Sequence, residues 1–305
     1  MLITLASPRS SEIAGEYGSK ALYRNLGYYS IICLLRVHVL LGDFTLALKV
    51  MDPIPLTRKA EFTKVTACHV ALYYYVGFSY LSLGRYADAA NTFVSILRYY
   101  SRMQQFHTRS YQYGAISKTC DRMYALLAIC TSLAPGPVDD ASGIIPAMKE
   151  QLGDKLAEMA RGVDALDTYE ELYLSACPKF ISANPPPYED PSSYALYTAD
   201  PPADPPARHA ALFLDDVRAL AAVPKTRSLL KLYTSIGAEK LGTLIDEDAE
   251  RVLEDMMVLK QASRTYKNGG EAGLMNGSRA VVNNLDFFVD NVRPPLEAGP
   301  LLVLG

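Results

Sequence analysis

Residues 73–93 read YYYVGFSYLSLGRYADAANTF, in which small, aromatic and apolar residues recur at helical spacing on both sides of a glycine. Gly84 predicts a turn, and its flanks predict two antiparallel helices. Gly77 and Ala89 are small enough to let these helices approach each other closely. The stretch therefore predicts one unit of a helical repeat, with eight packing positions: Tyr73, Val76, Gly77, Tyr80, Gly84, Tyr86, Ala89 and Phe93.

The turn of this unit occurs twice in the chain. Leu41-Gly42-Asp43-Phe44-x-x-Ala47 recurs as Leu83-Gly84-Arg85-Tyr86-x-x-Ala89, 42 residues later. The second copy matches tetratricopeptide spacing at the eight packing positions, and the larger offset predicts longer helices or loops. Residues 123–130 add a further helical element before Pro135. The N-terminal part is therefore predicted to be an α-solenoid of two to four helix pairs.

Residues 184–206 differ sharply in composition from their flanks. They hold 8 of the 19 prolines of the chain, four acidic residues and no basic one. Proline lacks a backbone donor and disfavours helix interiors, so this segment predicts a linker or an extended surface strap. Both flanks have helical patterns.

The pattern after the strap predicts a winged helix. Apolar faces at helical spacing run through residues 226–236, 238–245 and 249–259, and Asp246, Glu247 and Asp248 open the third helix. A turn-rich run, 268–277, and a strand-like segment, 281–289, then predict a β-hairpin. We therefore predict a divergent N-terminal segment (1–25), TPR-like helical repeats (26–183), the strap (184–206), a helix with the winged helix (207–292) and an irregular C-terminal tail (293–305).

A mainly α fold of helical repeats followed by a winged helix resembles the PCI proteins, which are scaffold subunits of the proteasome lid, the COP9 signalosome and eukaryotic translation initiation factor 3. Within that class the chain resembles the C-terminal part of the subunit L family of initiation factor 3. Family members continue into a C-terminal helix, which the proline- and glycine-containing residues 293–305 are not expected to form. The matching blocks are Tyr73–Leu81, Arg85–Ala89, Tyr124–Ile129, Tyr169–Leu172, Cys177–Phe180, Leu230–Tyr233 and Lys240–Leu241, with Leu244.

The resemblance implies a non-catalytic scaffold that supports translation initiation on the small ribosomal subunit. Its partners would be other PCI-type subunits, packed edge to edge, and the ribosome would be reached through the complex. The sheet edge at residues 280–289 could pair with a neighbour's strand. Candidate interface residues, each of which could equally belong to the core, are Tyr233, Met257, Phe287 and Phe288.

Sequence motifs for catalysis are not found. The four histidines are far apart, the five cysteines form no CxxC pair, and neither GxSxG nor a P-loop occurs. We therefore expect no enzyme activity, small-molecule substrate, cofactor or metal. The apolar stretch 65–83 contains a histidine and four tyrosines, which favours a buried helix over a membrane span. The N-terminus lacks the pattern of a secretory signal, so we expect a cytoplasmic protein.

Two alternatives remain open. The chain could serve a different PCI assembly, the proteasome lid or the signalosome. It could also bind RNA directly, although residues 246–255 carry six acidic residues and one arginine, which disfavours duplex reading by the third helix. The candidate RNA-contacting residues are Arg85, Arg98, Arg102, Arg109, Lys260, Arg264 and Lys267.

Overall fold

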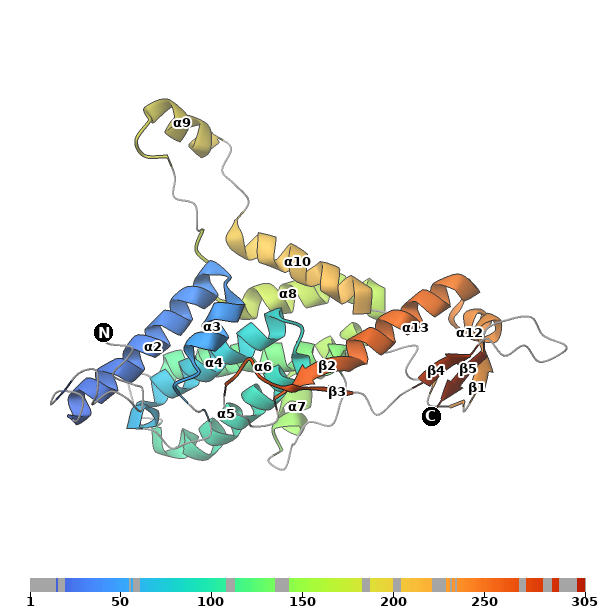
Figure 1. The fold of residues 1–305 in the computed structure, drawn as a ribbon, viewed down its shortest axis with the longest axis horizontal. Coiled ribbons are helices and arrows are strands. Elements are labelled where there is room, and N and C mark those ends of the chain that lie inside the picture. The colour runs from blue at the N-terminus through green and yellow to red at the C-terminus, as the bar shows by residue number, and fades with distance from the viewer. Residues whose placement is uncertain are drawn as a thin grey trace.

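A computed structural model gives the fold of the chain (Figure 1). It describes residues 20–54, 61–107, 113–134, 143–182, 187–199, 204–220, 235–268, 273–281, 287–290 and 301–304, and the positions 15, 56, 229, 230, 232 and 233. A helical body occupies most of the molecule, and a small sheet with two helices lies at one end. The predicted class, a helical repeat followed by a winged helix, is confirmed.

The body is built from helices that follow one another in the chain. The helices are α2 (Ala21–Leu41), α3 (Phe44–Val50), α4 (Thr66–Ser82), α5 (Tyr86–His107), α6 (Tyr113–Leu133), α7 (Ile144–Met159), α8 (Leu166–Ala176) and α10 (Pro205–Leu220), with 3-10 turns at Glu61–Lys64 and Gly162–Ala165.

The two copies of the repeated turn have the same geometry. Gly42 and Gly84 adopt left-handed φ angles of 82° and 71°, which favour glycine because other side chains are strained there. The amide after each glycine donates back to the helix that has just ended. These bonds run from Asp43 N to His38 O and from Arg85 N to Tyr80 O, both at 2.9 Å. The sequence repeat is thus a repeat of one helix–turn–helix unit.

Helix α4 is the central helix of the body. It contacts α2 and α3 on one side and α5 and α6 on the other. Gly77 lies against the ring of Phe93 on α5, and a Cβ at this position would come within 2.4 Å of Phe93 Cε1. The apolar stretch 65–83 is therefore used for helix packing inside the protein. Among the helices that the structure describes, none is long and apolar enough to cross a membrane.

The strap region contains helix where the sequence predicted extended chain. Helix α9 spans Pro191–Ala199, and α10 begins at Pro205. Both helices begin at a proline, which is tolerated in the first turn because the missing N–H would have no partner in the helix. Helix α10 then packs on α8, where the rings of Tyr173 and Phe213 stack with centroids 4.5 Å apart.

The winged helix has its own small core and sheet. Helices α12 (Ala238–Ile245) and α13 (Ala249–Ser263) pack on a sheet of order β1-β5-β4, formed by Ser235–Gly237, Leu301–Leu304 and Phe287–Asp290. Both pairings are antiparallel, with Ile236 opposite Leu302 and Val289 opposite Leu302 from the other side. The core residues are Leu230, Ile236, Leu241, Ile245, Val252, Met256, Leu259 and Phe287.

Three details differ from the prediction. Residues 293–305 were expected to be irregular, but Leu301–Leu304 form the central strand β5. The expected helix 226–236 is helical at residues 229–230, whereas Ile236 lies in β1 and Leu232 is exposed. The expected strand 281–289 is divided between two sheets, because Ser278–Val281 (β3) pairs with Arg264–Lys267 (β2) while Phe287–Asp290 forms β4. At Ile236, pairing with the distant strand β5 overrides the local helical pattern.

Candidate functional site: a polar joint between the hairpin and the helical repeat

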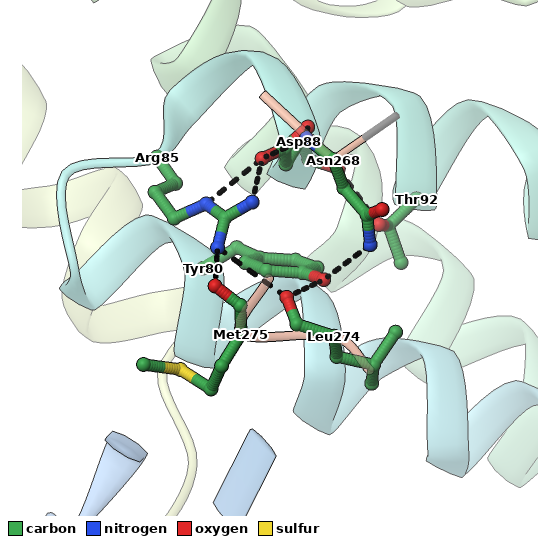
Figure 2. Close-up of polar contacts among 7 residues, drawn as sticks. All are labelled: Tyr80, Arg85, Asp88, Thr92, Asn268, Leu274 and Met275. Carbon is green, nitrogen blue, oxygen red and sulfur yellow. Dashed lines mark hydrogen bonds and ion pairs between the residues drawn. The ribbon is translucent and has the colours of Figure 1, made fainter. Parts of the chain in front are cut away.

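The β2–β3 hairpin leaves the winged helix and lies against the turn between α4 and α5 (Figure 1). Figure 2 shows the residues that meet there, Tyr80, Arg85 and Asp88 from the repeat and Asn268, Leu274 and Met275 from the hairpin loop. We call these six residues the joint. Helix α13 runs from the sheet directly into this hairpin, so the joint attaches the winged helix to the repeat.

Arg85 and Asp88 form the charged centre of the joint. Arg85 Nε donates to Asp88 Oδ2 at 2.8 Å, and Arg85 Nη2 lies 2.6 Å from the same oxygen. The two side chains retain only 8% and 5% of their exposure, so each charge depends on the other. Arg85 Nη1 also donates to the carbonyl oxygens of Leu274 and Met275, at 3.3 and 3.1 Å.

Asp88 connects the repeat to the hairpin backbone as well. The amide of Asn268 donates to both Asp88 carboxylate oxygens, at 3.1 and 3.3 Å. Asp88 lies in the first turn of α5, where the helix dipole favours a negative charge. Thr92 Oγ1 donates to the backbone oxygen of Asp88 at 2.7 Å. One carboxylate therefore satisfies an arginine of its own helix turn and an amide 180 residues further along the chain.

Tyr80 contributes its ring, which lies against the Arg85 guanidinium, and a further hydrogen bond. Its hydroxyl donates to Leu274 O at 2.8 Å, and Asn268 Nδ2 contacts the same hydroxyl at 3.5 Å. Arg85 Cζ lies 4.8 Å from the centroid of the Tyr80 ring, within cation–π range. Burial raises the pKa of Tyr80, although the Asn268 contact and the Arg85 charge act in the opposite direction. Tyr80 therefore stays protonated and acts as a donor.

The titratable groups of the joint are engaged in hydrogen bonds, Asp88 with Arg85 and Asn268 and Tyr80 with Leu274. The polar atoms of the joint bind one another and backbone carbonyls, which connects the hairpin loop to the repeat. From the sequence, Tyr80 was predicted as a repeat-packing position and Arg85 as a candidate RNA contact. The run 268–277 was predicted as the turn of a β-hairpin. Nothing in the sequence indicated that this run lies on the α4–α5 turn, so the roles of Asp88 and Asn268 were missed.

The eight repeat-packing positions all lie at the α4–α5 pair. Val76, Ala89 and Phe93 are fully buried, Tyr80 and Tyr86 nearly so, and Tyr73 is half-buried with its hydroxyl donating to Leu56 O at 3.0 Å. Except for Gly84, which lies in the turn, and the half-buried Tyr73, these residues belong to the buried core of the repeat.

The candidate interface residues differ in how deeply they are buried. Phe287 is buried in the small core, and the carbonyl of Phe287 accepts from Lys260 Nζ at 2.8 Å. Tyr233 packs at the edge of the same core, whereas Met257 on α13 is 59% exposed. The side chain of Phe288 lies outside the described residues. Of the described three, Met257 has the surface that a partner could reach.

The candidate RNA-contacting residues differ in exposure. Arg85 is buried in the joint, and Lys260 is bound to the carbonyl of Phe287. Arg98 is half-buried on α5. Arg102, Arg264 and Lys267 are exposed, and Arg109 lies outside the described residues.

Cys120 and His69 lie in structural surroundings, whereas Cys33 is exposed. Burial raises the pKa of Cys120 to about 12, so its thiol is not a nucleophile at neutral pH. Burial lowers the pKa of His69, whose ring meets those of Tyr73 and Tyr99 edge to face. Within the described part of the chain, no three His, Cys, Asp or Glu side chains are grouped so that they could hold a metal ion.

The fold and the joint define a class of protein: a helical repeat that carries a winged helix, with a buried polar contact between the two. Within it, the chain belongs to the family described as RNA polymerase I-associated factor PAF67, whose model matches residues 4–293.

Curated relatives carry a different name. Proteins named eukaryotic translation initiation factor 3 subunit L are 46% identical in Mycosarcoma maydis, over 92% of this chain, and 45% identical in Aspergillus oryzae, over 91%. A third, from Aspergillus clavatus, is 44% identical over 92%. The resemblance to the subunit L family is therefore confirmed. The chain spans about half the length of these relatives, 42% of the first and 56% of the other two.

Proposed function

We propose that the chain is a non-catalytic scaffold subunit of the cytoplasmic translation initiation factor 3 complex. The observation that carries this proposal is the 46% identity, over 92% of the chain, to a protein named subunit L of that factor. In this role the chain supports initiation on the small ribosomal subunit by holding other subunits in place, and it needs no substrate or cofactor of its own.

The joint supports a scaffold role. A scaffold transmits position, so its parts must keep a fixed orientation relative to each other. The buried Arg85–Asp88 pair and the bonds to Asn268, Leu274 and Met275 restrain the hairpin on the repeat. A partner bound to the winged helix is thereby held at a defined angle to a partner bound to the repeat.

The sheet edge at β4 is the surface we assign to a sister PCI-type subunit. In the described sheet β4 pairs with β5 on one side, and its other side carries no described strand. An edge strand offers backbone groups for pairing with a strand of another subunit. Val289 on β4 is 37% exposed and Met257 is 59% exposed, which gives this end of the molecule apolar contact surface.

A mild-salt pull-down of the tagged chain from cell extract, read by quantitative mass spectrometry, tests the proposal. We expect the other subunits of initiation factor 3 together with small-subunit ribosomal proteins. Recovery of proteasome lid or signalosome subunits would assign the chain to a different assembly. Recovery of RNA without protein partners would favour the RNA-binding alternative.

The matched variant for this experiment is Val289→Pro. Proline removes one backbone donor from β4 and is poorly accommodated where a strand pairs on both sides. If β4 is the subunit contact, this variant loses sister subunits while the repeat remains folded. The control is Leu212→Ala, at an exposed position on α10 outside the sheet, which should leave the recovery of sister subunits unchanged. A proline at this position would instead unfold α10.

A further inference from the structure

Helix α9 stands clear of the helical body on the side of α10 (Figure 1). It spans nine residues, Pro191–Ala199, which is shorter than the length at which an isolated helix is stable in water. A short helix without a supporting core needs local interactions to persist. We call residues 187–199 the arm.

The arm contains such interactions at its N-terminus. Asp190 Oδ1 accepts from Ser192 Oγ at 2.9 Å, and Asp190 Oδ2 accepts from Ser193 Oγ at 2.8 Å. The backbone oxygen of Asp190 accepts from Tyr194 N at 2.9 Å, which closes the first turn. Pro191 follows the cap and already has helical φ. The hydroxyl of Ser193, first, and then Ser192 lower the pKa of Asp190, so the cap stays ionised.

Two tyrosines are held together across this cap. The rings of Tyr188 and Tyr194 stack with centroids 5.7 Å apart and an interplanar angle of 30°. Their side chains are nevertheless 71% and 42% exposed. Tyrosine contributes large contact area with little loss of side-chain entropy, and it is enriched at the centres of protein interfaces.

The charges around the tyrosine pair are all negative. Glu189 and Asp190 lie between the two rings in sequence, and both are exposed. Residues 184–206 include four acidic residues and no lysine, arginine or histidine. Phosphate backbones and anionic lipid surfaces would be repelled by this segment. A protein surface with basic residues is the complementary partner.

We propose that the arm docks, as a preformed helix with a tyrosine pair, into an apolar cleft of another protein whose rim carries lysine or arginine. The cap at Asp190 and the stacked rings favour the helix in the free chain, which lowers the entropy lost on binding. The proposal does not depend on the identity of the complex, because it rests on the arm alone.

Photo-crosslinking from the arm tests this directly. The full chain is produced in cells with the photoreactive residue p-benzoylphenylalanine in place of Tyr188, irradiated, and the crosslinked peptides are sequenced. We expect a peptide of another protein that lines an apolar cleft with lysine or arginine at its rim. The same replacement at Tyr266 on β2, 56% exposed, is the control and should label different peptides.

Reversing the charge of Glu189 distinguishes specific docking from random contact, because only specific docking depends on that charge. Adding Glu189→Lys should lower the crosslink yield from position 188 about ten-fold, since one unfavourable charge at a rim is worth roughly that factor. Tyr194→Ala, which removes the stacked ring, should lower it as well. Neither variant should change the melting temperature, because neither side chain is part of the core.

Several results would overturn the proposal. These are crosslinks to RNA, to a second copy of the chain or only within the same chain; a partner cleft without basic residues; a yield unaffected by Glu189→Lys; or no crosslink from position 188.

Discussion

The helical repeat packs segments that are neighbours in the chain, whereas the winged helix is closed by strands that are far apart in sequence. In the repeat, α4 packs on α5 and α5 on α6, each directly after the other. In the winged helix, Ser235 pairs with Val303, and the part of the unit that the structure describes has a core of eight buried residues. A substitution in the large core should therefore destabilise the repeat locally without unfolding it. In the small core, the stability of the whole unit depends on each buried residue.

The largest effect is expected at the joint between these two regions. Asp88→Ala leaves the buried Arg85 without its counter-charge and removes the acceptor of the Asn268 amide. Breaking a buried ion pair in this way costs about 3–5 kcal/mol of unfolding free energy. Chemical denaturation measures this loss, and hydrogen exchange should show faster exchange in the β2–β3 hairpin.

A second Asp–Arg pair provides the control for that variant. Asp215 and Arg218 on α10 have the same three-residue spacing, but their side chains are 67% and 56% exposed. Asp215→Ala should cost less than about 1 kcal/mol, because exposed pairs contribute little. Equal losses at the two sites would mean that burial does not set the strength of the joint.

Phe287→Ala tests whether the small core behaves as one unit. Phe287 is 1% exposed, and truncating a buried phenylalanine costs about 3 kcal/mol or more. We expect hydrogen-exchange protection to be lost through α12 and α13 and kept in α4 and α5. Val289→Ala on the same strand, 37% exposed, should have little effect. Loss of protection in α4 would show that the two regions unfold together.

Gly77→Leu tests the repeat in the same manner. Even a Cβ would come within 2.4 Å of the Phe93 ring, so the larger side chain must push α4 and α5 apart. Overpacking of this kind costs about 1–3 kcal/mol. Gly114→Leu on α6 is the control, since a Cβ there meets no atom within 4 Å. A melting curve that is the same as wild type for Gly77→Leu would remove this contact from the core.

The smallest effect concerns RNA and the acidic start of α13. Reversal of Glu247, Asp248 and Glu250 to lysine should not weaken RNA binding, because these carboxylates repel phosphates. A filter-binding assay on wild type and the triple variant measures this. Weaker binding in the variant would give α13 an RNA-contacting role that its charge argues against.

The sequence predicted best where the determinants are local. The turn at Gly84 and the close approach of α4 and α5 at Gly77 follow from spacing within a single repeat unit. The joint could not be predicted, because nothing in the run around Asn268 points to Asp88, 180 residues away. Strand β5 was missed because four apolar residues in a proline- and glycine-containing tail have no local signal that outweighs their surroundings.

The position of β5 sets an order of events during synthesis. The helices of the repeat can pack as each leaves the ribosome, whereas β1 and β4 have no strand between them until Leu301–Leu304 have been made. A chain that stops short of Leu301 would therefore carry a finished repeat beside two strands with open edges. Unpaired strand edges can pair with strands of other chains. A stop codon before Leu301 would therefore produce an aggregation-prone protein rather than a shorter functional one.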